Sequence, residues 1–217
     1  MAKAARKQKD LVFSYLEHRK VIGILGITLP FIVSIGASLF FSNNLQNSIS
    51  SYYHTGMRDV FVGILFVIGF FLLAYRGHER ADDIAGDLAC LFAIGVALFP
   101  TTGGKLSQAT EMTGYIHLAF AAAFFITLAY FSLKLFTKTN PDKTPTKKKF
   151  QRNKVYKTCG WTIIGCIVIM AVLSFLPAGT KASLESLRPV FWLEAIAIIA
   201  FGISWFTKGE GILKDLD

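Results

Sequence analysis

Long apolar runs restrict this chain more than any other feature of its sequence. The first run extends from Val21 to Phe41 without a charged side chain. No water is present in hydrocarbon to bond backbone N–H and C=O groups, so a run of this kind is stable there only as a helix or in a closed barrel. About 20 apolar residues are enough for a helix to cross. With 53% hydrophobic and 17% charged residues among 217, we predict an all-α polytopic membrane helix bundle.

The apolar runs predict a six-helix transmembrane domain over residues 21–206. Residues 1–20 precede it as a basic segment at the membrane interface, and residues 207–217 follow it as a tail. The first run is too long for the apolar core of a cleaved signal peptide, so we expect it to be retained as an anchor. The predicted spans cover about 21–41, 58–75, 84–99, 115–136, 158–176 and 190–206.

The distribution of Lys and Arg predicts the orientation of the bundle. If both termini are cytoplasmic, the cytoplasmic segments hold nineteen of the 23 basic residues, which is a strong positive-inside bias. The loop 138–157 is the most basic of these segments, and we expect anionic lipid headgroups to bind there. The loop lacks the interleaved aromatic residues of nucleic-acid-binding segments, so no nucleic acid is predicted as a partner.

Small and aromatic residues suggest how the helices pack and how deep they lie. Gly23 and Gly26 in the first span would allow a neighbouring helix to approach closely. A ridge of alanines at four-residue spacing would do the same in the third span: Ala85, Ala89, Ala93 and Ala97. Four aromatic residues are typical of the belts at the membrane interfaces: Tyr52, Tyr53, Trp192 and Trp205.

Ionisable and polar side chains gather at the predicted outer ends of three spans. An ionisable group inside a span is energetically expensive and is a candidate functional residue for that reason. Three of these residues also have a structural interpretation. Asp59 could interact favourably with the dipole of the helix that it begins, Arg58 could extend to lipid headgroups, and Glu194 could pair with Arg58 or Arg188. The six candidate ligand-binding residues are Tyr53, His54, Arg58, Asp59, His117 and Glu194.

These residues predict an outward-facing pocket that binds a lipid headgroup or a small polar ligand. Arg58 would contact an anion, and Glu194 would be its buried counterpart. The donors of His54, His117 and Glu194 are also of the kind that zinc accepts, so a metal-dependent intramembrane lipid hydrolase is an alternative. A channel or transporter, a structural subunit of a membrane assembly and a homo-oligomer remain open.

One sequence pattern resembles an uncharacterised group of bacterial six-span membrane proteins. The resemblance implies a cell inner membrane location and no particular activity. That group often has tyrosine at the position of His54 and asparagine at that of Asp59, which gives weight to Arg58 and the tyrosine pair. The pattern is Ser50-x-Tyr52-Tyr53-x-Thr55-x-Met57-Arg58-x-x-Phe61-Val62-Gly63, followed by Tyr75-x-Gly77, Ala85-Gly86 and Val96-Ala97-Leu98-x-Pro100-Thr101.

A fainter pattern is similar to the alkaline ceramidase type of intramembrane hydrolase. Ser50 precedes His54 by four residues, as a serine precedes a histidine in that family. The family also has two histidines on one late helix, and the sequence has none there. The resemblance implies a metal-dependent hydrolase. The chain departs from the family in its metal ligands, because these two histidines are missing.

Overall fold

The chain folds into a bundle of long helices, and the described residues contain no strand. The computed structural model describes residues 2–77, 79–102, 108–139 and 144–214. In chain order, the elements are α1 (Ala2–Phe41), the 3-10 helix η1 (Ser50–His54), α2 (Arg58–Ala74), α3 (Arg80–Leu98), α4 (Gln108–Tyr130), the π-helical turn η2 (Phe131–Leu135), α5 (Lys147–Ser174), α6 (Ala178–Glu185) and α7 (Pro189–Lys208).

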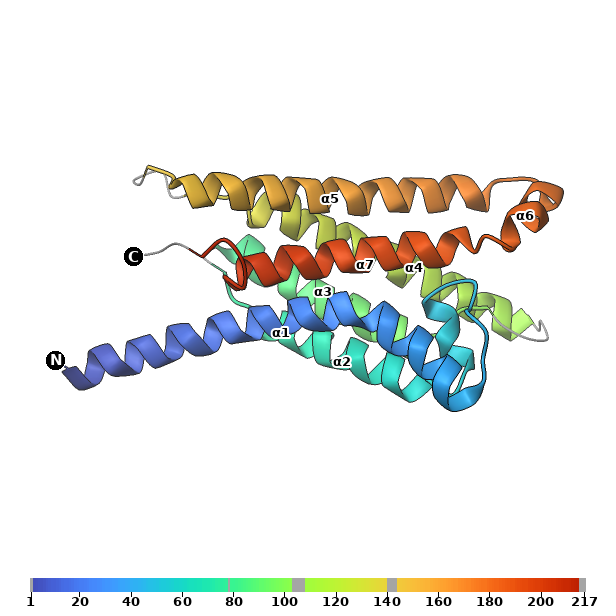
Figure 1. Cartoon of the computed structure of the whole chain (residues 1–217), viewed down its shortest axis with the longest axis horizontal. Coiled ribbons are helices and arrows are strands. Elements are labelled where there is room, and N and C mark those ends of the chain that lie inside the picture. The colour runs from blue at the N-terminus through green and yellow to red at the C-terminus, as the bar shows by residue number, and fades with distance from the viewer. Residues whose placement is uncertain (1, 78, 103–107, 140–143, 215–217) are drawn as a thin grey trace.

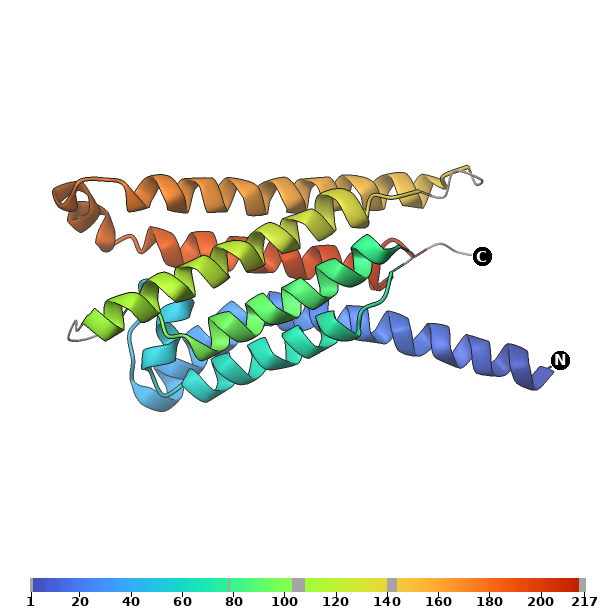
Figure 2. The ribbon, with the colours of Figure 1, turned by 180° about the vertical axis from the view of Figure 1, so that it is seen from behind.

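The long helices run antiparallel along one axis, each returning past its predecessor (Figures 1 and 2). The start of α1 and the end of α7 lie together at one end of the bundle, which we call the termini end. The short helices η1 and α6 lie at the opposite end, which we call the loop end. An up-and-down order of this kind brings the first and last helices side by side.

Among the residues that the structure describes, four helical segments are long and apolar enough to cross a membrane. The predicted all-helical membrane fold is therefore confirmed at this level. Helices α2 and α3 are not among these segments. Helix α2 is apolar but has only 17 residues, and α3 carries the charged residues Asp82 and Asp83 in its first turn. The four segments are Tyr15–Phe41, Glu111–Leu135, Lys147–Ser174 and Pro189–Lys208.

Three helical segments add detail to the predicted ones. Helix α1 begins at Ala2 and runs without a break from the basic N-terminal segment into the first predicted span. Helix α5 begins inside the predicted basic loop, because the Thr146 hydroxyl caps it by accepting from the Lys149 N–H at 3.0 Å. Helix α6 was not expected at all. Residues 140–143 of the basic loop and 215–217 of the tail lie outside the described residues.

Helices α1 and α7 approach so closely that glycine is required at their contact. A Cβ atom on Gly202 would lie 2.6 Å from both the carbonyl oxygen of Gly23 and the amide nitrogen of Ile27. Helices α2 and α3 also pack through small residues, since a Cβ atom on Gly86 would meet the Leu72 carbonyl at 2.6 Å. The alanine ridge of α3 is buried along its whole length, as close helix packing in a membrane demands.

An aromatic cluster fills the core near the termini end. The Trp205 ring packs edge-on against the rings of Tyr75, Phe131 and Phe136 at 5.1 to 5.3 Å. The prediction that Tyr52 and Trp205 belong to interfacial belts is wrong, because both side chains are completely buried. Composition cannot distinguish an aromatic residue that faces a headgroup from one at the same depth that faces a neighbouring helix.

The Gly202→Ala substitution tests the contact between α1 and α7. In a free helix it would stabilise by up to about 1 kcal/mol, but here the added methyl group meets backbone atoms that cannot move aside. We expect a net destabilisation of about 1–3 kcal/mol, measured as a lower midpoint of thermal unfolding in detergent. Gly165→Ala is the matched control, because a Cβ atom there meets nothing within 4 Å; an equal loss in both variants would contradict this packing.

Candidate functional site

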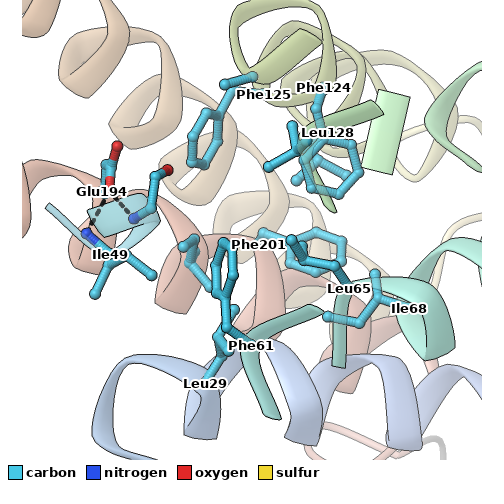
Figure 3. A pocket seen from close by; sticks show the side chains of 14 residues that line it. Leu29, Ile49, Phe61, Leu65, Ile68, Phe124, Phe125, Leu128, Glu194 and Phe201 are labelled. Carbon is cyan, nitrogen blue, oxygen red and sulfur yellow. Dashed lines mark hydrogen bonds between the residues drawn. The ribbon is translucent and has the colours of Figure 1, made fainter. Parts of the chain in front are cut away.

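Glu194 connects α7 to the loop that enters η1. Its carboxylate oxygen Oε2 accepts hydrogen bonds from the backbone N–H groups of Ile49 at 2.6 Å and Ser50 at 3.2 Å (Figure 3). Ile49 caps η1 without a side-chain hydrogen bond of its own, so a carboxylate from a distant helix satisfies amides that the helix start leaves free. The other carboxylate oxygen points away from these two amides.

The loop that Glu194 holds is also braced internally. The hydroxyl groups of Ser48 and Ser51 lie 2.6 Å apart, and Ser48 Oγ also accepts from the Ser51 N–H at 3.0 Å. Tyr52 is buried beneath the loop, and its hydroxyl accepts from the Gln46 N–H at 3.4 Å. Burial raises the pKa of Tyr52, since the phenolate would lose its hydration. The Tyr52 hydroxyl therefore stays protonated at neutral pH. The hydrogen bonds of Tyr52 and Ser48 to backbone amides give the loop a defined shape.

His117 lies on α4 with its side chain only 4% exposed. Its Nδ1 is 2.6 Å from the Phe99 carbonyl oxygen. A carbonyl oxygen only accepts, so the proton belongs on Nδ1, and Nε2 of the neutral ring carries a lone pair. Among the described residues, Nε2 is buried and has no hydrogen-bond partner. A buried acceptor of this kind is costly to leave unpaired.

Three cavities meet at Glu194. The polar cavity, of about 370 Å³, is bordered by Ser48, Ser50, Thr101, Glu111 and His117 together with Glu194. The amphipathic cavity, of about 610 Å³, lies between α4, α5, α6 and α7 and shares Leu118, Val190 and Glu194 with the polar cavity. The inner cavity, of about 30 Å³, lies deeper, among aromatic and aliphatic side chains (Figure 3).

The amphipathic cavity combines an apolar wall with a charged rim. Met170 and Leu173 of α5 face it from one side, whereas Lys181, Glu185 and Arg188 line it near the loop end. Arg188 has a φ of 48°, a left-handed conformation that is strained for a residue with a Cβ atom. Strain of this kind is often found at binding sites.

Two of the six candidate residues share a cavity. His117 and Glu194, which are distant in sequence, both line the polar cavity. Sequence reasoning placed them at similar depth, and the structure brings them together from α4 and α7. Neither is paired with an arginine: Glu194 is bonded to backbone amides and His117 to a carbonyl group.

The other four candidate residues do not line any of the three cavities. Arg58 lies over the ring of Tyr53 at 4.6 Å and donates to its hydroxyl at 2.9 Å. The exposed His54 contacts the Thr101 carbonyl oxygen through Nε2 at 2.8 Å. Asp59 is exposed in the first turn of α2. These residues therefore form the outer surface of the loop end.

The sequence analysis did not identify several residues of the cavities. Ser48, Ser50 and Lys181 line the cavities and were not among the residues predicted to bind a ligand. Pro177 was the available signal in the sequence, because Pro is frequent around the first position of a helix, and α6 begins at the next residue. A helix at that point turns Lys181 and Arg188 toward one cavity.

The described residues contain no group of three or more His, Cys, Asp or Glu side chains that could hold a metal ion. The candidate zinc ligands are accordingly dispersed, with His54 on the exterior and Glu194 bonded to backbone amides. Comparison of the chain with protein-family models, with curated proteins and with solved structures finds no match. The fold itself defines the class: a helical, multi-pass membrane protein with a cavity system at one end.

Replacement of Glu194 tests its role in holding the loop. In Glu194→Ala the amides of Ile49 and Ser50 lose their acceptor, which leaves two donors unsatisfied at a cost of about 1–3 kcal/mol each. We expect hydrogen exchange of these two amides to accelerate at least about tenfold. Glu194→Gln, which keeps an acceptor oxygen, should show a smaller increase.

Asp59→Ala is the matched control for the loss of one negative charge at the same end of the bundle. Exchange of Ile49 and Ser50 should be unchanged in that variant, since Asp59 lies on the exposed first turn of α2. Similar acceleration in Asp59→Ala and Glu194→Ala would show that net charge, rather than the two hydrogen bonds, orders the loop.

Proposed function

We propose that the protein binds an amphiphilic ligand at the loop end, with the uncharged part of its headgroup in the polar cavity, its anionic group at the charged rim of the amphipathic cavity and its chain along the apolar wall of that cavity. The observation that carries this proposal is the position of Glu194, Val190 and Leu118 on the wall common to both cavities. A ligand with one polar and one apolar part matches two cavities that share a wall, because Ser48, Ser50 and His117 border one of them and Met170 and Leu173 the other. Ligand sites of this size are usually apolar with a few placed polar groups.

We further propose that all six long helices span the cytoplasmic membrane of a bacterial cell, with the termini end inside. Helices α2 and α3 lie alongside the four apolar helices (Figure 2), and α2, with 17 residues, would extend about 25 Å. The Lys and Arg distribution supports this orientation. The cavities then open in the outer half of the membrane, where a lipid headgroup can enter.

The charges at the amphipathic cavity favour an anionic headgroup. Lys181 and Arg188 line it, and Lys181 Nζ donates to the Ser174 carbonyl oxygen at 2.7 Å. Glu185 is bonded to the Asn47 side chain at 3.1 Å, so its charge is partly engaged. We therefore assign the anion contact to Lys181 and Arg188 instead of Arg58, because Arg58 is bonded to Tyr53.

The polar cavity offers hydrogen-bonding groups for the uncharged part of a headgroup. Nε2 of His117 is an acceptor without a described partner, and Ser48 and Ser50 bring hydroxyl groups to the same space. A ligand hydroxyl that donated to His117 would satisfy the buried nitrogen. The hydrolase alternative needs a metal in this place, and stoichiometric zinc that is lost on His117→Ala would favour it over ligand binding.

The Val190→Trp substitution tests the proposed site, since Val190 lies on the wall shared by the two cavities and the larger indole ring would occupy space in them. We expect the wild-type protein to retain phospholipid after extraction into mild detergent, and the variant to retain at least about tenfold less. Native mass spectrometry of both proteins measures the bound lipid. Ile196→Trp is the control, because Ile196 lies on the same helix and is 46% exposed.

Two results would overturn the binding function. One is a wild-type protein that neither retains a phospholipid nor binds added phosphatidylglycerol. The other is an equal loss of lipid from Val190→Trp and Ile196→Trp, which would place the lipid on the outer surface of the bundle.

A further inference from the structure

Two lysines from different helices converge on Phe136 at the termini end. Lys149 Nζ, at the start of α5, donates to the Phe136 carbonyl oxygen at 2.9 Å. Lys208 Nζ, at the end of α7, lies 5.1 Å from the centre of the Phe136 ring. Both side chains are half-buried. Their ammonium groups are therefore held near each other, although like charges repel.

Arg19 of α1 brings a third cation to the same region. Its guanidinium group lies over the rings of Tyr15 at 4.3 Å and Tyr75 at 5.3 Å. Its Nε is buried and has no hydrogen-bond partner among the described residues. The Tyr75 ring contacts Trp205, which lies one turn before Lys208 on α7. The aromatic cluster thus fixes Arg19 beside the end of α7.

The nearby carboxylates leave this cluster with excess positive charge. Arg19, Lys149 and Arg152 are the cations that act electrostatically on Lys208, and Asp82 is the acidic group that does so. Asp82 is already engaged by Lys138, whose Nζ lies 3.4 Å from its carboxylate. Arg152 donates to the Leu213 carbonyl oxygen at 2.8 Å. An anion bound beside Arg19, Lys149 and Lys208 would reduce the repulsion between these three groups.

We propose that Arg19, Lys149 and Lys208 bind the phosphate group of an anionic phospholipid between α1, α5 and α7. Lys208 is the last residue of one apolar segment, and Arg19 lies near the start of another, which is the depth expected for lipid phosphates. Basic sites between transmembrane helices on the cytoplasmic side are suited to such headgroups. This site rests on the proposed orientation of the bundle in the membrane, but it lies at the opposite end from the proposed ligand cavities and does not depend on ligand binding there.

A simpler explanation is general attraction by the summed charge of the basic segment. The two explanations differ in which lysines matter. A specific site depends on Lys149 and Lys208, whereas summed charge depends equally on the exposed Lys154 and Lys157 of α5. Exposed charges are also screened more strongly by salt than half-buried ones.

The test compares two double variants of the full chain in detergent micelles. Short-chain phosphatidylglycerol, phosphatidylcholine and inorganic phosphate are titrated separately, with binding followed by native mass spectrometry. We expect Lys149→Gln with Lys208→Met to weaken phosphatidylglycerol binding at least about tenfold. Lys154→Gln with Lys157→Gln, which removes the same charge, should weaken it less than about twofold.

The outcomes separate the sources of phosphate and the effects of folding. Tighter binding of phosphatidylglycerol than of phosphatidylcholine or inorganic phosphate supports a lipid site. Equal affinity for inorganic phosphate overturns the lipid assignment in favour of a free-anion site, and equal losses in the two double variants overturn the specific site. The unfolding midpoint of Lys149→Gln with Lys208→Met is measured in parallel. Arg19→Gln supplies a second test, since it should weaken phosphatidylglycerol binding without any change to the two lysines.

Discussion

The absence of water in the membrane interior is the constraint on which this structure depends. Every backbone polar group at that depth must be bonded within the protein, and the long helices satisfy this requirement along most of their length. Helix ends cannot satisfy it alone. The carboxylate of Glu194 supplies the missing acceptor for Ile49 and Ser50 at one end, and the Thr146 hydroxyl does so for Lys149 at the other.

Close packing in such an environment depends on small residues and interlocking rings. Without a hydrophobic difference between helix and lipid, contact area must come from close approach. Gly202 lets the backbone of α7 meet that of α1, and the completely buried Trp205 joins α7 to the rings of Tyr75 and Phe136. These contacts hold the first and last helices together, and this brings residues from both ends of the chain into shared sites.

Both proposed sites lie at the ends of the bundle for the same physical reason. Charged groups near the membrane centre are costly, whereas at the ends they can reach water, headgroups or backbone amides. At the loop end, Glu194 marks the junction of polar and apolar spaces. At the termini end, Lys149 and Lys208 are held against Phe136. Each arrangement depends on helices that are distant in the sequence.

The sequence by itself determined the helical membrane class, since the apolar runs leave few other folds, and it determined that polar side chains gather near helix ends. It also placed His117 and Glu194 at similar depth. Only the tertiary structure decided which side chains share a cavity, because depth along a helix does not specify the direction of a side chain around it. For this reason Arg58 contacts Tyr53 rather than Glu194, Trp205 faces the core rather than the interface, and Lys181 and Arg188 line a cavity through a helix that hydropathy did not predict.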